Sequence, residues 1–258
     1  MKILLTLLVT FFAGMGAVLG TGFAGMSAAA VVSPMLITFL GMEPYMAVGI
    51  ALSSDVLASA VSAYTYKKNG NLDVKNGLIM MVSVLVFTVV GSWVSSLVPS
   101  TTMGTFSVFM TFLLGIRFIV RPVMTTKEAM QGVSAKKRAI QSVVCGIFIG
   151  FICGFVGAGG GMMMLLILTS VLGYELKTAV GTSVFIMAFT AFTGAVSHFA
   201  IGGTPDWTVW ILCVIFTLLW ARIAAVFANK ATPKTLNRVT GVILVILGIV
   251  VMAFSMFA

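Results

Sequence analysis

The segment GFVGAGGG, at positions 154–161, carries the clearest chemical signal in the chain. Five of its eight residues are glycines, which leave the backbone amides uncovered. Free N–H groups in a glycine-rich turn, or at a helix start, bind anions without needing a cationic side chain. We therefore predict that Gly157, Gly159, Gly160 and Gly161 bind an anion. The alternative interpretation is structural, because small residues also allow membrane helices to pack closely.

Hydroxyl groups interrupt two long apolar runs of the sequence. Ser53 and Ser54 lie at the centre of the run 44–66, and Thr182 and Ser183 lie near the start of the run 176–200. Hydroxyls can donate hydrogen bonds to the oxygens of an anion. These four residues are therefore predicted to line the same substrate site as the glycines.

Asp55 is the only acidic residue far from any loop. A carboxylate inside a membrane is costly unless it is neutral, paired or functional. Removal from water favours the protonated form, which could carry a coupling proton. The alternative is a permanently protonated aspartic acid that is hydrogen-bonded to Ser53 and Ser54.

The glycine cluster belongs to a duplicated segment, because residues 14–70 recur 132 positions later without a gap. The shift aligns Gly14 with Gly146, Gly22 with Gly154, Gly25 with Gly157, Glu43 with Glu175, and Gly70 with Gly202. Most identities are glycines, which mark backbone geometry rather than shared apolar composition. The first copy of the joint, GTGFAG at 20–25, adds Gly22, Gly25 and the nearby Ser27 to the predicted substrate site. The partner of Asp55 is Met187, so the two copies are not chemically equivalent.

Composition identifies an integral membrane protein. Of the 258 residues, 60% are hydrophobic and only 8% are charged, too few to cover a soluble domain. The net charge of +9 does not indicate nucleic-acid binding, because the basic residues lie in short loops between apolar runs. All three cysteines lie within apolar runs and are expected to be small buried side chains.

Each copy contains five apolar segments, which predicts an all-α membrane protein. The expected segments are 3–20, 26–40, 44–66, 75–97 and 101–120, then 139–153, 159–172, 176–200, 207–228 and 236–257. The second segment of each copy has about 15 residues and reaches roughly 22 Å, short of the 30 Å of a hydrocarbon core. The first two segments must therefore form a hairpin, whether or not the second one spans fully.

A hairpin adds either no crossing or two crossings, so each copy crosses the membrane an odd number of times and the copies must be inverted. The distribution of basic residues agrees with this prediction, because fourteen of the fifteen can face the cytoplasm and only Lys2 is left outside. We predict a first repeat at 1–120, a basic cytoplasmic linker at 121–138 and a second repeat at 139–258. Both termini then lie on the outer side of the cell membrane.

The chain resembles the sulfite exporter TauE/SafE family of membrane permeases. The resemblance is most specific in the glycine cluster, in Leu172-Gly173, in the segment 179–183 and in Gly203 with Asp206-Trp207. It covers essentially the whole chain and is weaker in the first half, where Ser27, Ala28 and Ala29 replace three glycines. The resemblance implies transport of small sulfur-containing anions such as sulfite, sulfonates or sulfoacetate, driven by an ion gradient.

We therefore predict a secondary transporter in the cytoplasmic membrane, with the substrate site where the inverted repeats meet. The coupling ion is a proton or sodium, and the partners are the substrate anion and the lipid bilayer. No cofactor, metal, nucleic acid or catalytic residue is expected, and the sequence does not indicate an oligomeric state. The alternatives are a membrane-embedded enzyme, which lacks a plausible nucleophile and base, and a non-transporting membrane partner or metal channel.

Overall fold

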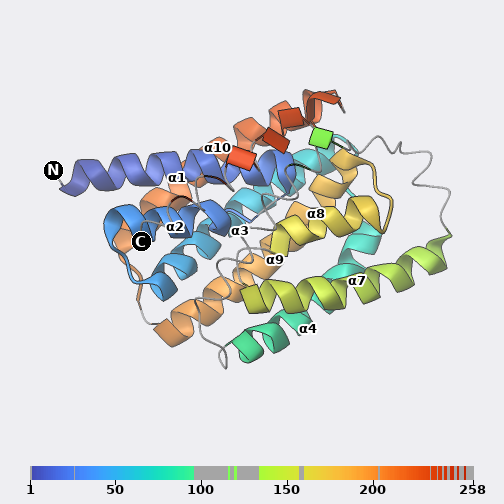
Figure 1. Ribbon diagram of the computed structural model, residues 1–258, viewed down its shortest axis with the longest axis horizontal. Coiled ribbons are helices and arrows are strands. Elements are labelled where there is room, and N and C mark those ends of the chain that lie inside the picture. The colour runs from blue at the N-terminus through green and yellow to red at the C-terminus, as the bar shows by residue number, and fades with distance from the viewer. Residues whose placement is uncertain are drawn as a thin grey trace.

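The protein is a bundle of long helices, as seen in the computed structural model (Figure 1). The structure describes residues 2–25, 27–95, 134–156, 160–202 and 204–232, and separate residues within 116–120 and 234–253. The described residues form helices and no strand, which confirms the predicted all-α class. The helices are α1 (Lys2–Ala24), α2 (Ala29–Leu40), α3 (Pro44–Lys68), α4 (Val74–Ser95), α7 (Ala135–Val156), α8 (Gly160–Ser170), α9 (Leu176–Gly202) and α10 (Trp207–Lys230).

The helix bounds follow the duplication seen in the sequence. Adding 132 to the bounds of α1, α2, α3 and α4 gives those of α7, α8, α9 and α10 to within three residues. Most residues of the predicted segments at 101–120 and 236–257, and most of the linker at 121–138, lie outside the described residues. Helix α7 begins at Ala135, so the last four residues of that predicted linker are helical.

The second helix of each repeat is too short to cross a bilayer. Helix α2 has 12 residues and α8 has 11, which gives lengths of about 18 Å and 17 Å. Figure 1 shows α2 lying alongside α1 and α8 lying alongside α7. Each hairpin therefore contains one long helix and one half-helix.

Both long helices of the hairpins extend further than the sequence predicted. Helix α1 continues to Ala24 rather than ending at residue 20, and α7 continues to Val156 rather than ending at 153. Glycines permit a helix break but do not force one, and Gly22 stays helical where α1 packs on α10. The first joint, residues 25–28, begins at Gly25, which has a positive φ of 62°.

Equivalent helices of the two repeats run in opposite directions. The Asn71 amide, in the turn between α3 and α4, donates to Asn229 Oδ1 near the end of α10 at 2.7 Å. Lys177, at the start of α9, donates to the Asn229 carbonyl at 2.8 Å. Helix α3 thus ends where its counterpart α9 begins, which is what an inverted repeat requires.

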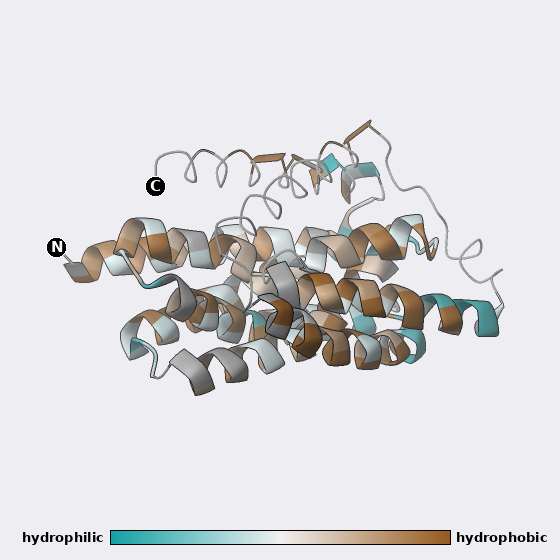
Figure 2. Ribbon diagram, turned by 60° about the horizontal axis from the view of Figure 1, so that its bottom comes forward, coloured by the Kyte–Doolittle hydropathy of each residue, from teal (hydrophilic) through white to brown (hydrophobic). Residues whose placement is uncertain are grey.

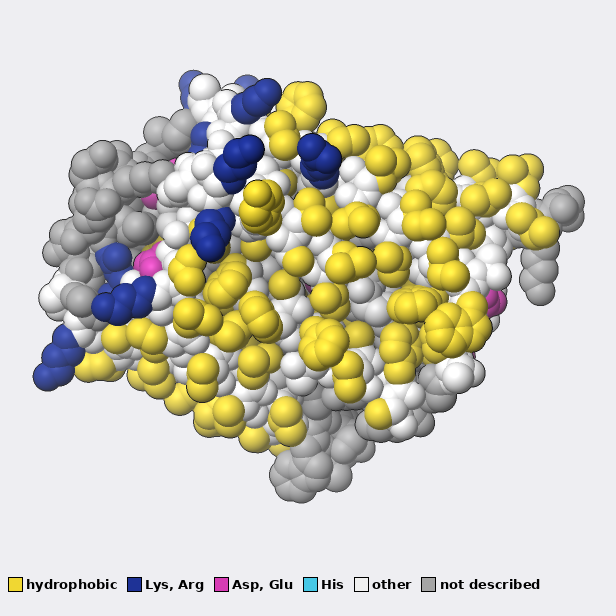
Figure 3. Space-filling model, turned by 180° about the vertical axis from the view of Figure 1, so that it is seen from behind, with side chains coloured by type: hydrophobic (Ala, Val, Ile, Leu, Met, Phe, Trp, Pro, Cys, Tyr) yellow, Lys and Arg dark blue, Asp and Glu magenta, His cyan; other side chains and the backbone are white. Residues whose placement is uncertain are grey.

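We call this end of the bundle the basic end, because Lys and Arg side chains gather there (Figure 3). It carries the exposed basic residues Lys67, Lys68, Lys75, Lys136, Lys137 and Lys230 at the adjoining helix termini. The rest of the face in Figure 3 is mainly hydrophobic, and Figure 2 shows the hydrophilic residues concentrated near helix ends. Among the residues that the structure describes, five helices are long and apolar enough to cross a membrane, namely α1, α3, α4, α9 and α10.

Glycines set the close packing between the repeats. The equivalent residues Gly14 and Gly146 face the fourth helix of the opposite repeat, where an added Cβ would stand 3.0 Å from the Phe216 backbone or 2.8 Å from the Met80 carbonyl. Helix α1 packs on α10 as α7 packs on α4, and α3 packs on α9 between them. Packing across the repeat boundary therefore explains this pair of repeated glycines.

Side-chain caps recur in both repeats. Asp73 accepts from the backbone N–H of Asn76, and Asp206 accepts from the N–H groups of Thr208 and Val209. In each repeat an aspartate thus caps the helix that follows it. Glu43 and Glu175 form a second equivalent pair, each accepting from the N–H three residues later.

The inverted arrangement predicts opposite accessibility for two exposed turns. In a background without cysteine, Thr204→Cys should react with a membrane-impermeant maleimide added to intact cells. Lys68→Cys lies at the basic end and should react only after the cells are opened. Labelling of both positions from the same side would contradict the predicted orientation.

Candidate functional site

The first joint lies between α3 and α9, well inside the bundle. The carbonyl of Gly25 accepts a hydrogen bond from Ser183 Oγ at 2.7 Å, and Ser183 lies about 10 Å along α9 from its start. A Cβ at Gly25 would stand 3.0 Å from the Cβ of Ser183, and the positive φ also favours glycine. The joint of one repeat is thus fastened to the third helix of the other.

Asp55 belongs to α3, and its side chain lies at the start of the half-helix α2. Its carboxylate oxygens accept from Ser27 Oγ at 2.7 Å and from Ser59 Oγ at 2.8 Å. The backbone N–H of Ala28, the residue before α2, is a third donor. The side chain is completely buried. In this repeat, the protein's own acid therefore fills the anion-binding end of the half-helix.

The partners of Asp55 differ from those that the sequence suggested. Ser53 and Ser54 precede Asp55 directly and do not bond to it, because residues one or two apart point to different sides of a helix. Ser54 instead donates to the carbonyl of Ala51 at 2.8 Å. Ser59 is four residues along α3, which places its hydroxyl on the same side as the carboxylate.

A polar stripe on α3 continues from Asp55 toward the basic end. Asp55, Ser59, Ser62 and Tyr66 are spaced as one face of a helix, and all four are fully buried. Tyr66 donates to the carbonyl of Gly22 at 2.7 Å, while Ser62 Oγ has no hydrogen-bond partner among the described residues. Their counterparts in α9 include Met187 and Ala191, so the stripe belongs to the first repeat only. This spacing could have been recognised in the sequence.

The four predicted hydroxyls do not converge on one point. Ser53 accepts from Trp210 Nε1 at 2.6 Å, and Thr182 Oγ1 accepts from the N–H of Asp73 at 3.2 Å. Only Ser183 contacts the first joint directly. The bonds of Ser53 and Thr182 connect helices of opposite repeats, and their role in substrate binding stays a prediction.

Four of the six predicted glycines lie within the described residues, and Gly25 belongs to the first joint. Gly22 faces α10, where an added Cβ would stand 2.6 Å from that of Ala224, and Gly160 and Gly161 form the start of α8. Gly157 and Gly159 lie outside the described residues. Met187, which replaces Asp55 in the second repeat, is buried in α9.

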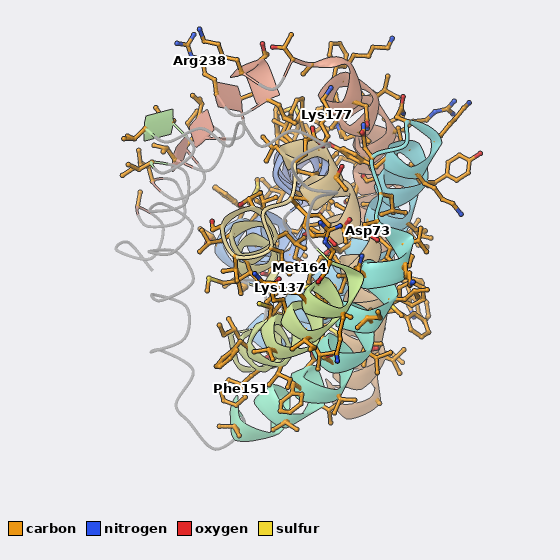
Figure 4. All side chains as sticks on the ribbon, turned by 90° about the vertical axis from the view of Figure 1, so that its right-hand side faces the viewer. Asp73, Lys137, Phe151, Met164, Lys177 and Arg238 are labelled. Atoms are coloured by element: carbon orange, nitrogen blue, oxygen red, sulfur yellow. The ribbon has the colours of Figure 1, made fainter. Side chains whose placement is uncertain are left out.

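A polar cluster at the basic end was missed by the sequence analysis. Tyr174 Oη donates to Asp73 Oδ2 at 2.8 Å, and the guanidinium of Arg138 lies over the Tyr174 ring, 5.5 Å from its centroid. Burial raises the pKa of the Tyr174 phenol, so this residue remains a donor. Figure 4 shows this end with Asp73, Lys137 and Lys177 labelled. The cluster joins residues more than 100 positions apart, and no local pattern marks it.

Two apolar grooves adjoin each other along α3 and α9. One is lined by side chains such as Ala60, Leu72 and Phe185, and the other by Ser53, Trp210 and Ile215; Val56 and Phe192 line both. These linings suit lipid chains better than a hydrated anion. Among the residues that the structure describes, no three His, Cys, Asp or Glu side chains are grouped to hold a metal ion.

The hydrogen bonds of Asp55 predict a difference between two serines on the same face of α3. Ser59→Ala removes a donor from a buried carboxyl group and should lower the unfolding free energy by about 1–3 kcal/mol. Ser62→Ala is the matched control and should cost far less, because this hydroxyl has no partner. Thermal unfolding of both variants in detergent tests the prediction, and equal losses would contradict it.

Comparison with known proteins assigns the chain to a family. The model of the family described as "Sulfite exporter TauE/SafE" matches residues 10–251. The probable membrane transporter protein YunE of Bacillus subtilis is 25% identical over 223 residues, covering 81% of each chain. A probable membrane transporter protein of Haemophilus influenzae is 26% identical over 222 residues, covering 84% of this chain and 80% of the relative. No solved structure was found to match. The chain therefore belongs to the sulfite exporter TauE/SafE family and is a multi-pass membrane transporter.

Proposed function

We propose that the protein is a secondary transporter that moves a small sulfur-containing oxoanion across the cytoplasmic membrane, coupled to an ion gradient. The observation that carries the proposal is the carboxylate of Asp55 at the start of α2. Three donors surround it at a helix break inside the bundle. The fold thus supplies hydrogen-bond donors for acidic oxygens at the start of a half-helix, with no Lys or Arg among them.

The second repeat has an equivalent half-helix but no acid at the position equivalent to Asp55. Helix α8 begins with Gly160 and Gly161, and the position equivalent to Asp55 is Met187. A methionine can neither accept the amide hydrogen bonds as a carboxylate does nor balance the positive end of the helix dipole. We infer that the transported anion takes this place, opposite the internal carboxylate of the first repeat.

The substrate class follows from the family and from the kind of donor. The matched family is described as a sulfite exporter, and sulfite and sulfonates present several oxygens to surrounding N–H groups. A glycine-rich helix start offers several such donors from the backbone. Small sulfur oxoanions, including sulfite, sulfonates and sulfoacetate, are therefore the substrates that we propose.

Asp55 is the proposed coupling residue. It is buried at the centre of α3 and contacts the first joint, which Ser183 fastens to α9. A proton gained or lost by this carboxyl group would change its bonds to Ser27 and the Ala28 N–H. Protonation could therefore alter how tightly α2 is held between the repeats.

The substrate prediction can be tested with purified protein in proteoliposomes. Labelled sulfite, sulfoacetate and taurine should be offered with a pH gradient and a sodium gradient imposed separately. We expect accumulation of at least one sulfur anion above the level of protein-free vesicles. A protein that moves none of them under either gradient would contradict the proposed substrate class.

Gly160→Leu should abolish transport while the protein remains folded in the membrane. A leucine side chain at the start of α8 would occupy space that an anion needs to approach the backbone amides. Ala200→Leu, at an exposed position of α9, controls for the added volume. Wild-type binding by a folded Gly160→Leu variant would remove this joint from the site.

Asp55→Asn should retain anion exchange but lose accumulation driven by a pH gradient. The amide oxygen can accept from one of the two serines and the amide NH2 can donate to the hydroxyl of the other, but the amide cannot titrate. Asp206→Asn is the matched control, because this exposed cap tolerates either residue. Undiminished proton-driven accumulation in Asp55→Asn would exclude Asp55 as the proton carrier and favour sodium coupling.

A further inference from the structure

Arg138 is a buried cation, and two of its three donor nitrogens have no hydrogen-bond partner in the part of the chain that the structure describes. The side chain is only 8% exposed, whereas Lys136 and Lys137 in the same turn of α7 are exposed. Its Nε and Nη2 atoms are buried and have no hydrogen-bond partner among the described residues. A buried charge is costly unless it is paired and hydrogen-bonded, so this guanidinium requires a partner.

The neighbouring acid does not serve as that partner. Asp73 already accepts from the Asn76 N–H, from the Asn76 amide and from Tyr174 Oη. Arg138 meets the ring of Tyr174 instead, 5.5 Å from its centroid. The tyrosine therefore bonds to the acid through its hydroxyl group and presents its ring to the cation.

The position of Arg138 adds further positive potential. It is the fourth residue of α7, after Lys136 and Lys137, and the first turn contains no acid. Cations ordinarily destabilise a helix N-terminus, because the helix dipole is positive at that end. The three cationic side chains in this first turn therefore favour an anionic ligand.

The two unused atoms define the shape of the ligand. Nε and Nη2 lie on one edge of the planar guanidinium and donate in parallel, which matches two oxygens of a sulfonate, sulfite or phosphate group. We propose that this edge of Arg138 binds an oxoanion at the basic end, beside Tyr174. The site is separate from the start of α8.

This second site extends the proposed function. The identity of its anion as the transported substrate rests on that function. If the protein transports a sulfur oxoanion, Arg138 holds that anion at the basic end before or after passage through the bundle. The same chemistry also fits the phosphate of a lipid headgroup. The test must therefore separate a free anion from a lipid.

The experiment measures the apparent melting temperature of the full-length protein in a maltoside detergent, which contains no phosphate. Sulfite and phosphate are titrated separately at constant ionic strength, and then phosphatidylglycerol is added in place of free anion. We expect stabilisation by an oxoanion source, with at least a tenfold weaker apparent affinity in Arg138→Gln. Lys75→Gln removes an exposed charge at the same end and should behave as wild type.

The outcomes identify the source or overturn the site. Dependence on Arg138 with free sulfite or phosphate supports a soluble anion, and dependence only with phosphatidylglycerol supports a lipid headgroup. Equal responses of Arg138→Gln and Lys75→Gln to every source would overturn the proposal. Glu128 is an acidic residue of the predicted linker. The proposal would also be overturned if the oxoanion response appeared only after Glu128→Gln, since Arg138 would then be paired with that acid.

The wild type and the Gly160→Leu variant test this site separately from the proposed function. Gly160→Leu should lose transport but keep the Arg138-dependent stabilisation. Stabilisation without transport of any sulfur anion by the wild type would leave the oxoanion site in place and contradict the proposed function. Transport without Arg138-dependent stabilisation would contradict the site alone.

Discussion

The rest of the architecture depends on how the protein satisfies a helix break within a bilayer. Backbone N–H and C=O groups at such a break have no water to bond to, so the protein must supply partners. At the first joint, Asp55 accepts from the Ala28 N–H and from Ser27, while Ser183 donates to the Gly25 carbonyl. These partners come from α3 and α9, one from each repeat. The break can therefore exist only when both repeats are packed around it.

Packing across the repeat boundary is close enough to make those contacts because glycines replace larger residues there. A Cβ at Gly181 would collide with the Asn71 carbonyl, and one at Gly150 would collide with that of Val84. Such contacts with backbone atoms cannot be relieved by turning a side chain. The same approach of α9 to the turn after α3 places Thr182 beside the N–H of Asp73. Glycine packing and polar contacts between repeats are thus parts of one interface.

The helices could be predicted from the sequence because the length of each apolar run is a local signal, and the duplication repeats that signal. The sequence predicted the hairpins and the burial of Asp55, both of which the structure contains. It did not predict the partners of Asp55, because nearness along the chain favoured Ser53 and Ser54. Helical geometry instead selects Ser59, and folding of the hairpin supplies Ser27. The contact between Arg138 and Tyr174 depends on tertiary packing alone.

The two repeats share a fold but carry different side chains at equivalent positions. A symmetric duplication would place the same groups at both joints and at both ends of the bundle. Here the acid and the polar stripe are confined to α3, and the position equivalent to Arg138 in the first repeat is Thr6. Asp55 bonds to the first joint from α3, and α3 packs against α9 of the other repeat. The coupling that we propose for Asp55 would therefore act directly on the packing between the repeats.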